Sequence, residues 1–114
     1  MEETIFSKII RREVPATIVE ETERVLAFHD VNPQAPIHIL IIPKKELRDI
    51  AGAGSEDTEL LGELLLVATK IARDQGLEEK GYRLVVNTGE EGGQTVAHLH
   101  VHLLGGRQFN WPPG

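Results

Sequence analysis

The sequence predicts a single domain that mixes one long helix with several short strands. Apolar residues recur at helical spacing over residues 55–76, whereas five shorter segments show the alternating or continuous apolar pattern of strands. A chain of 114 residues, 40% of them hydrophobic, can bury one core of modest size. We therefore expect residues 1–114 to fold as one domain.

The N-terminal part of the chain predicts a short helix and then a hairpin. Thr4 can cap a helix that has an apolar face, and Pro15 would end it. Residues 17–20 and 24–29 have strand character and are separated by a polar turn, which favours a hairpin. Residues 30–36 contain two prolines and are expected to form a loop.

The middle of the chain predicts a buried strand followed by the long helix. Residues 37–43 form a nearly continuous apolar run, as in a central strand that is covered on both faces. His38 within this run is most simply a core imidazole satisfied by a hydrogen bond. Ser55 can begin the helix and Gly76 can close it, and the aliphatic stripe between them indicates packing against the sheet.

The C-terminal part predicts a strand, a glycine-rich loop and an extended tail. Residues 82–87 have strand character, and residues 88–95 form the loop. Successive N–H groups around Gly93 could cradle a phosphate, although a hairpin turn without a ligand is as common. The tail, residues 105–114, should be helix-free, and its Trp111 either covers another surface or lies in water.

The segment 96–104 carries the strongest functional signal. Strict alternation would place His98, His100 and His102 on one face of a strand and apolar residues on the other. Alternate residues of a strand are roughly 6.6 Å apart, so the three imidazoles would form a row, which disfavours one ion bound by all three. A metal held by two of them with His38 stays open, as does a polar strand that faces solvent.

Composition and charge exclude several classes of function. The net charge of −6 argues against binding a nucleic-acid polymer, because such binding depends on many Lys and Arg contacts to phosphates. Without cysteine the chain has no disulfide, thiolate metal site or cysteine nucleophile. The first residues contain no apolar run long enough for a signal peptide or a membrane span. We therefore expect a cytoplasmic protein that binds no membrane.

The nucleophile can be sought by elimination. There is no cysteine, and both serines lie in or at predicted helices, away from the histidines. Histidine is itself a competent nucleophile toward phosphorus when one ring nitrogen is free and an acceptor holds the proton of the other. His100, central in the row, is best placed for this role. We expect His102 to donate to phosphate oxygens and His98, with His38, to steer protons.

Short motifs spread over nearly the whole chain resemble those of one known family. They are the histidine motif at 98–104, His38, and residues 28–30, 33–36, 42–45, 92–94, 105–108 and 111–114. Together they resemble the histidine triad (HIT) superfamily and within it the Hint branch. The final Trp-Pro-Pro-Gly is more specific for that branch than the three histidines alone.

The resemblance implies an α+β fold with a five-stranded antiparallel sheet, one long helix and one short helix. It implies a homodimer in which two sheets join into one of ten strands. It also implies a purine nucleoside phosphoramidase, which cleaves the P–N bond at a nucleoside 5′-phosphate through a nucleotidyl-histidine intermediate. We expect purine nucleoside monophosphate derivatives as ligands and no metal or other cofactor.

The resemblance also assigns roles to individual residues. His100 would be the nucleophile, and the residues around the phosphate and leaving group would be Asn87, Gly93, Thr95 and His102. Asp30 would bind the ribose hydroxyls, although a lone aspartate in a loop is usually a turn former. Phe6, Phe28 and Val31 would lie near the base, while His38 and His98 would complete a histidine relay. We further expect Trp111 to reach the active site of the partner subunit, because an exposed tryptophan is otherwise unexplained.

The sequence departs from the Hint pattern at a few positions, and two other functions stay open. A serine is usual at Thr95, which keeps the hydroxyl but adds a methyl group on the leaving-group side, and the other departures are Ala97, Phe109 and Asn110. One alternative is a dinucleoside polyphosphate hydrolase of the same superfamily. The other is a nucleotide- or zinc-binding interaction module that catalyses no reaction.

Overall fold

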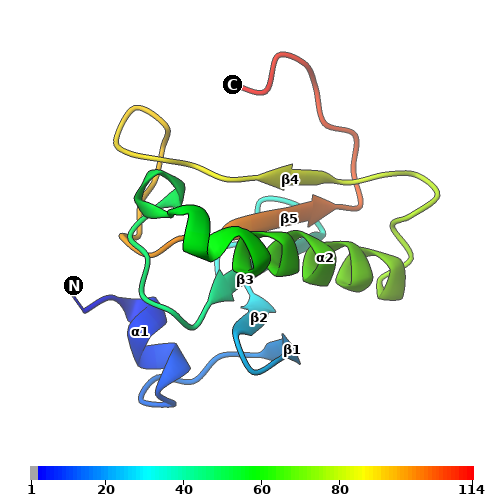
Figure 1. Cartoon of the computed structure of the whole chain (residues 1–114). Coiled ribbons are helices and arrows are strands. Elements are labelled where there is room, and N and C mark those ends of the chain that lie inside the picture. The colour runs from blue at the N-terminus through cyan, green and yellow to red at the C-terminus, as the bar shows by residue number, and fades with distance from the viewer. Residues whose placement is uncertain (1–2) are drawn as a thin grey trace.

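The computed structural model describes residues 3–114 and shows one antiparallel sheet with a helix packed on each face (Figure 1). Of the predicted domain, Met1 and Glu2 lie outside the described residues. The five strands are ordered β1-β2-β3-β5-β4 across the sheet, which confirms the expected α+β fold. Their bounds are Ile18–Glu21 (β1), Val25–His29 (β2), Ile37–Pro43 (β3), Arg83–Val85 (β4) and Val101–Gly105 (β5).

Both helices form where the sequence predicts them, but each differs from its prediction at one end: the first ends at Ile10, well before Pro15, and the second starts late. Helix α1 (Ile5–Ile10) is capped by Thr4, whose side chain accepts from the N–H of Ser7 in a capping box. Helix α2 (Thr58–Asp74) starts three residues later than expected, because Ser55–Asp57 form a separate 3-10 turn. The positive φ of 75° at Gly76 fits its predicted role just beyond the end of α2.

The main core lies between α2 and one face of the sheet. Leu64 and Ile71 of α2 pack against Ile39 and Ile41 of β3 and Val101 of β5, and all five are almost completely buried. Because side chains alternate along a strand, the residues between these positions point to the opposite face. That face carries a smaller cluster formed with α1, whose members are Phe6, Ile9, Leu26, Phe28, Leu40 and Ile42.

Strand pairing places two of the predicted site histidines on the α1 face. The prediction for β3 coincides with the observed bounds, and β3 is the central strand. Leu40 of β3 pairs with His102 of β5, and His38 pairs with Leu104. His38 and His102 are therefore diagonal neighbours on the same face of adjacent strands, within reach of each other.

Two strand predictions were too long. Strand β4 covers three residues of the expected 82–87, and β5 begins at Val101 instead of Val96. The β3–β5 ladder ends at the pair Ile41 and Val101. Beyond it, Pro43 has no N–H to donate and its carbonyl oxygen accepts from the His98 side chain at 2.8 Å. His98 and His100 therefore lie in the irregular segment that leads into β5.

The C-terminal tail leaves the sheet after β5 and runs past β4 (Figure 1). It contains no helix, as predicted, and Trp111 is 83% exposed. Within residues 3–114, neither helix has the length and apolar character that crossing a membrane requires.

Candidate active site

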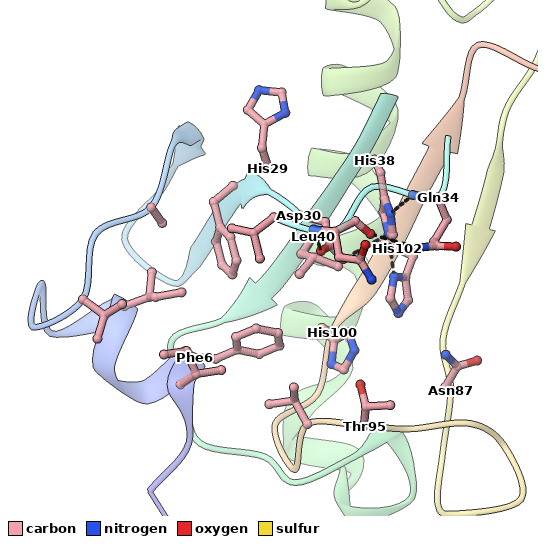
Figure 2. Close-up of a pocket in the computed structure, with 18 of the residues that line it drawn as sticks. Phe6, His29, Asp30, Gln34, His38, Leu40, Asn87, Thr95, His100 and His102 are labelled. Atoms are coloured by element: carbon pink, nitrogen blue, oxygen red, sulfur yellow. Dashed lines mark hydrogen bonds and ion pairs between the residues drawn. The ribbon is translucent and has the colours of Figure 1, made fainter. Parts of the chain in front are cut away.

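A cavity of about 610 Å³ opens on the α1 face of the sheet. One end is apolar, formed largely by α1 and β2, and the other end is polar (Figure 2). Most of the predicted site residues border this single cavity. They are Phe6, Phe28, Asp30, Val31, His38, Asn87, Gly93, Thr95, His100 and His102.

The proton of His38 can be assigned from its hydrogen bonds. The backbone N–H of Gln34 donates to Nδ1 of His38 at 3.0 Å, so Nδ1 is an acceptor. The neutral ring must then carry its hydrogen on Nε2, which lies 2.9 Å from Nδ1 of His102 and 3.4 Å from a carboxylate oxygen of Asp30. His38 is therefore a donor to His102.

The same reasoning assigns the proton of His102. Its Nδ1 accepts from His38, so the neutral ring carries its hydrogen on Nε2. This Nε2 is buried and has no hydrogen-bond partner among residues 3–114. A buried donor without a partner costs about 1–3 kcal/mol, so a site of this kind favours a ligand that supplies an acceptor.

His100 has the opposite arrangement. Its Nδ1 lies 2.7 Å from the backbone carbonyl oxygen of His98, which can only accept. The hydrogen of the neutral ring is therefore on Nδ1, and Nε2 carries a lone pair. The edge of the Phe6 ring packs against the imidazole, with centroids 5.1 Å apart. Nε2 of His100 makes no hydrogen bond within the described part of the chain, so its lone pair is free to attack.

The structure does not bring His98 to the cavity. Its side chain is fully buried, and Nε2 donates to the carbonyl oxygen of Pro43. Its Nδ1 has no partner within residues 3–114. His98 touches the site through its backbone carbonyl, which holds His100, and not through its imidazole.

Burial lowers the pKa of all four histidines of the cluster. Desolvation is the main cause of the lowered pKa in each of His38, His98, His100 and His102. The effect is largest for His102, where burial and the neighbouring rings of His100 and His38 bring the pKa to about 4. All four rings are therefore neutral at pH 7, as the assigned hydrogen positions require.

The loop beyond β4 forms the opposite wall of the polar end. Thr95 is exposed at the cavity and Asn87 is half-buried beside it (Figure 2). Gly93 has a positive φ of 82°, and its N–H donates to the carbonyl oxygen of Glu90 within the turn. The amide of Gly93 is thus already bonded in this conformation, so phosphate contacts from this wall would come from other groups.

One residue that contacts the histidine cluster received no role from the sequence. Gln34 lines the cavity, and its backbone N–H sets the proton position of His38. The sequence gives little indication of this role, because every residue except proline has a backbone N–H. Only its place between Pro33 and Pro36, which hold the loop in extended or turn conformations, indicates that its position is constrained.

The cluster of Asp30, His38 and His102 offers three potential metal ligands within 4.8 Å of one another. However, Nε2 of His38 and Nδ1 of His102 are 2.9 Å apart, the distance of a hydrogen bond. Two imidazole nitrogens bound to one tetrahedral zinc ion would be about 3.4 Å apart. In this conformation the residues do not fit a zinc ion, because the rings of His38 and His102 are hydrogen-bonded to each other.

The chain is similar to known proteins over nearly its whole length. A model of the HIT domain matches residues 11–109. A HIT-like protein of Synechocystis, described as uncharacterized, is 61% identical over 113 residues, which span 99% of this chain and 98% of the relative. A 14 kDa zinc-binding protein of Zea mays is 59% identical over 97% of this chain and 88% of its own length.

Solved structures show the same fold. A HIT family hydrolase from Legionella pneumophila superposes with a TM-score of 0.96 at 53% identity, covering 98% of this chain and all of that one. A histidine triad nucleotide-binding protein from Candida albicans superposes with a TM-score of 0.84 at 31% identity, covering 96% of this chain and 83% of that one.

Proposed function

The chain belongs to the HIT family, and on that premise we propose that it is a hydrolase of nucleotides, specifically a purine nucleoside phosphoramidase. The Legionella relative is called a hydrolase and the Candida relative a nucleotide-binding protein, which supports the general activity. The substrate we propose is a purine nucleoside 5′-phosphate whose phosphorus is bonded to an amine nitrogen. Two partial reactions would cleave that bond.

The observation that carries this proposal is the pair of opposite proton positions on His100 and His102. His100 presents a lone pair on Nε2, whereas His102 presents an N–H on Nε2. The ring centroids are 4.9 Å apart, so one phosphoryl group can meet both nitrogens. In the first step, Nε2 of His100 attacks phosphorus while His102 donates to a phosphoryl oxygen.

The amine leaves only if a proton reaches its nitrogen as the P–N bond breaks, because an amide anion is a very poor leaving group. Thr95 borders this side of the cavity and can relay a proton through its hydroxyl. The new bond joins phosphorus to Nε2 of His100. The hydrogen on Nδ1 stays in its bond to the carbonyl oxygen of His98, which stabilises the cationic adduct.

Water then completes the reaction. Its oxygen bonds to phosphorus, and the bond from phosphorus to His100 breaks with its electron pair returning to Nε2, which makes the ring neutral again. The proton that the water loses passes to Thr95 and replaces the one given to the amine. The products are the nucleoside monophosphate and the free amine. We propose that His38 contributes by holding Nδ1 of His102, so that the donor Nε2–H stays directed away from the strand pair.

The rest of the cavity fits the nucleoside. Asp30 accepts from the N–H of Asn32 with one oxygen, and its carboxylate retains lone pairs for the ribose hydroxyls. Phe6 and Phe28 meet edge to face with centroids 5.5 Å apart and form an apolar wall with Val31 at the rim. We propose that the purine base packs against this wall.

We also propose that the active form is a homodimer with one ten-stranded sheet. Strand β4 is at the edge of the sheet, with one side unpaired. On α2, Leu65 is 47% and Leu66 70% exposed, and we propose that the dimer covers them. Trp111 is 83% exposed, and we place it at the active site of the partner subunit.

A comparison of substrates tests the proposed function. Purified protein is given an adenosine 5′-phosphoramidate and, separately, a dinucleoside polyphosphate, with and without a metal chelator. The phosphoramidate should be turned over far faster, and the chelator should leave the rate unchanged. Preference for the polyphosphate would support the related hydrolase. Stoichiometric zinc, with no turnover of either substrate, would support a binding module of the kind that the name of the maize relative describes.

A further inference from the structure

Gln34 is held at both ends of its backbone by groups outside its own loop. Its N–H donates to Nδ1 of His38 at 3.0 Å. Its carbonyl oxygen accepts from Nε of Arg107 at 3.1 Å, and Arg107 lies in the C-terminal tail. The tail and the histidine cluster are therefore joined through a single residue.

The guanidinium of Arg107 is itself fixed in place. It stacks on the ring of Phe109 at 4.2 Å from the centroid, and Nη1 donates to the carbonyl oxygen of Gln108. Arg83 of β4 lies over the same ring at 5.2 Å and donates to the carbonyl oxygen of Asn110. Within residues 3–114 Arg107 forms no salt bridge, so nothing in the described chain competes for its Nε–H.

The loop around Gln34 has few other restraints. Pro33 and Pro36 have no N–H, so the loop cannot form a regular ladder of hydrogen bonds. Its other hydrogen bonds run from the N–H of Asn32 to Asp30 and from the Gln34 side chain to the carbonyl oxygen of Asn32. At the start of the loop, the N–H of Asp30 donates to the carbonyl oxygen of His38. Within residues 3–114, the hydrogen bond from Arg107 is thus the one hydrogen bond, apart from that to His38, which joins Gln34 to residues outside the loop.

We propose that Arg107 is a positioning residue that selects the tautomers of His38 and His102 through Gln34. The inference rests on the proposed function only for its effect on the reaction rate. When Arg107 holds Gln34 in place, the N–H of Gln34 occupies Nδ1 of His38 and keeps the hydrogen of that ring on Nε2. His38 then donates to Nδ1 of His102, which keeps the hydrogen of His102 on its Nε2. Arg107 touches no reacting atom and acts through this chain of hydrogen bonds.

The hydrogens of His38 and His102 have a second possible arrangement, which keeps one hydrogen bond between the two rings. If Gln34 moves away, His38 can carry its hydrogen on Nδ1 and accept with Nε2 from Nδ1 of His102. In this second arrangement Nε2 of His102 bears a lone pair and would repel a phosphoryl oxygen. In the observed arrangement the same nitrogen carries a hydrogen, which attracts that oxygen. The hydrogen bond from Gln34 disfavours this arrangement, because its N–H and an N–H on Nδ1 of His38 would face each other. The Asp30 carboxylate, 3.4 Å from Nε2 of His38, acts in the same direction.

The test compares Arg107→Ala with Lys80→Ala by NMR of protein labelled with 15N in its histidines. Lys80 lines the same surface hollow beside Phe109 but makes no contact with Gln34, so its variant removes a matched charge. In the wild type and in Lys80→Ala, Nε2 of His38 and of His102 should both show the shift of a protonated nitrogen. In Arg107→Ala, both rings should show mixed tautomers, whereas Nδ1 of His100 stays protonated.

Kinetics on the phosphoramidate give the second readout. Arg107→Ala should lower kcat about tenfold with KM little changed, because the altered group acts on the transition state and not on nucleoside binding. Arg107→Lys should recover part of the loss, since a lysine can reach a carbonyl but cannot keep the planar stack on Phe109. Unchanged tautomers in Arg107→Ala would overturn the inference. Altered tautomers in a protein whose wild type does not cleave the phosphoramidate would instead refute only the proposed function.

Discussion

Nδ1 of His100 donates across 2.7 Å to the backbone carbonyl oxygen of His98, so the main chain two residues earlier orients the proposed nucleophile. A backbone carbonyl cannot be removed by substituting a side chain. The contribution of His98 to the chemistry is therefore separable from that of its imidazole, which lies behind the cavity and donates to Pro43.

Replacement of the His98 side chain should reduce stability more than activity. His98→Leu leaves the Pro43 carbonyl without its donor inside the core, which should lower the free energy of unfolding by about 1–3 kcal/mol. The carbonyl that holds His100 remains, so kcat at a temperature where the variant is folded should fall less than tenfold. Urea unfolding and steady-state kinetics measure the two effects. If His98→Leu lowered kcat as much as the replacement of His102 does, the His98 imidazole itself would take part in a proton relay.

Replacement of His102 should reduce kcat much more than it reduces the affinity for AMP. His102→Leu removes the unpartnered Nε2–H that we assign to the phosphoryl oxygen. Loss of one such donor costs about a hundredfold to a thousandfold in kcat, while binding of AMP should weaken far less. Isothermal titration with AMP, alongside kcat, separates these effects. A loss of affinity with kcat unchanged would show that His102 serves binding alone.

The lowered pKa values of the histidines predict a loss of stability in mild acid. Their ordinary pKa of 6.5 applies to the unfolded chain, whereas the pKa of folded His102 is about 4. As pH falls from about 6.5 toward 4, the unfolded chain gains protons that the folded protein excludes, so the free energy of unfolding decreases. Carboxylates such as Glu63, with a pKa lowered chiefly by its bond to Thr22, contribute only below their own ordinary value of 4.5.

Denaturant midpoints measured between pH 7.5 and 5 check this expectation. The midpoint of the wild type should fall over that interval, and that of His102→Leu should fall less. A midpoint independent of pH in this range would show that the cluster takes up protons in the folded state as readily as in the unfolded one.

The proposed dimer can be broken at α2. Leu66→Glu places a charge on the exposed apolar face of the helix, where it would be desolvated in the dimer and harmless in a monomer. Sedimentation should show a dimer for the wild type and a monomer for the variant. Trp111→Ala should retain the dimer and alter the preference among amine leaving groups. A monomeric wild type, or unchanged preference in Trp111→Ala, would contradict the placement of the tail.

The sheet could be predicted closely from the sequence where the signal was local. The apolar run 37–43 marks β3 because a strand buried on both faces needs no polar alternation. The start of β5 could not be predicted in this way. His98 continues the alternating pattern, yet its imidazole bonds to Pro43, which is distant in sequence, and strand pairing stops before it.

The candidate site was likewise predictable in part: the sequence indicated the residues but not the positions of their protons. The alternation of histidines and the absence of cysteine led to His100 as nucleophile, and its lone pair lies beside the predicted partner His102. The proton positions depend on two backbone groups, the carbonyl of His98 and the N–H of Gln34. Backbone groups carry no residue identity, so only the folded chain reveals which tautomer each ring adopts.

The proposed role of His100 as nucleophile predicts the behaviour of its alanine variant. His100→Ala should still bind AMP, because the apolar wall and Asp30 are untouched, but it should not turn over the phosphoramidate. Rapid quenching of the wild type followed by mass spectrometry should place nucleotide on this residue. Substantial turnover by the variant would show that water attacks phosphorus without a covalent intermediate.

The stereochemical course at phosphorus tests the covalent mechanism most directly. A phosphoramidate in which sulfur replaces one phosphoryl oxygen is chiral at phosphorus, and hydrolysis in 18O-labelled water leaves a chiral product. Each in-line displacement inverts the centre, so attack by His100 followed by attack by water should give overall retention. Inversion would contradict the account, because it requires a single displacement in which water attacks phosphorus directly.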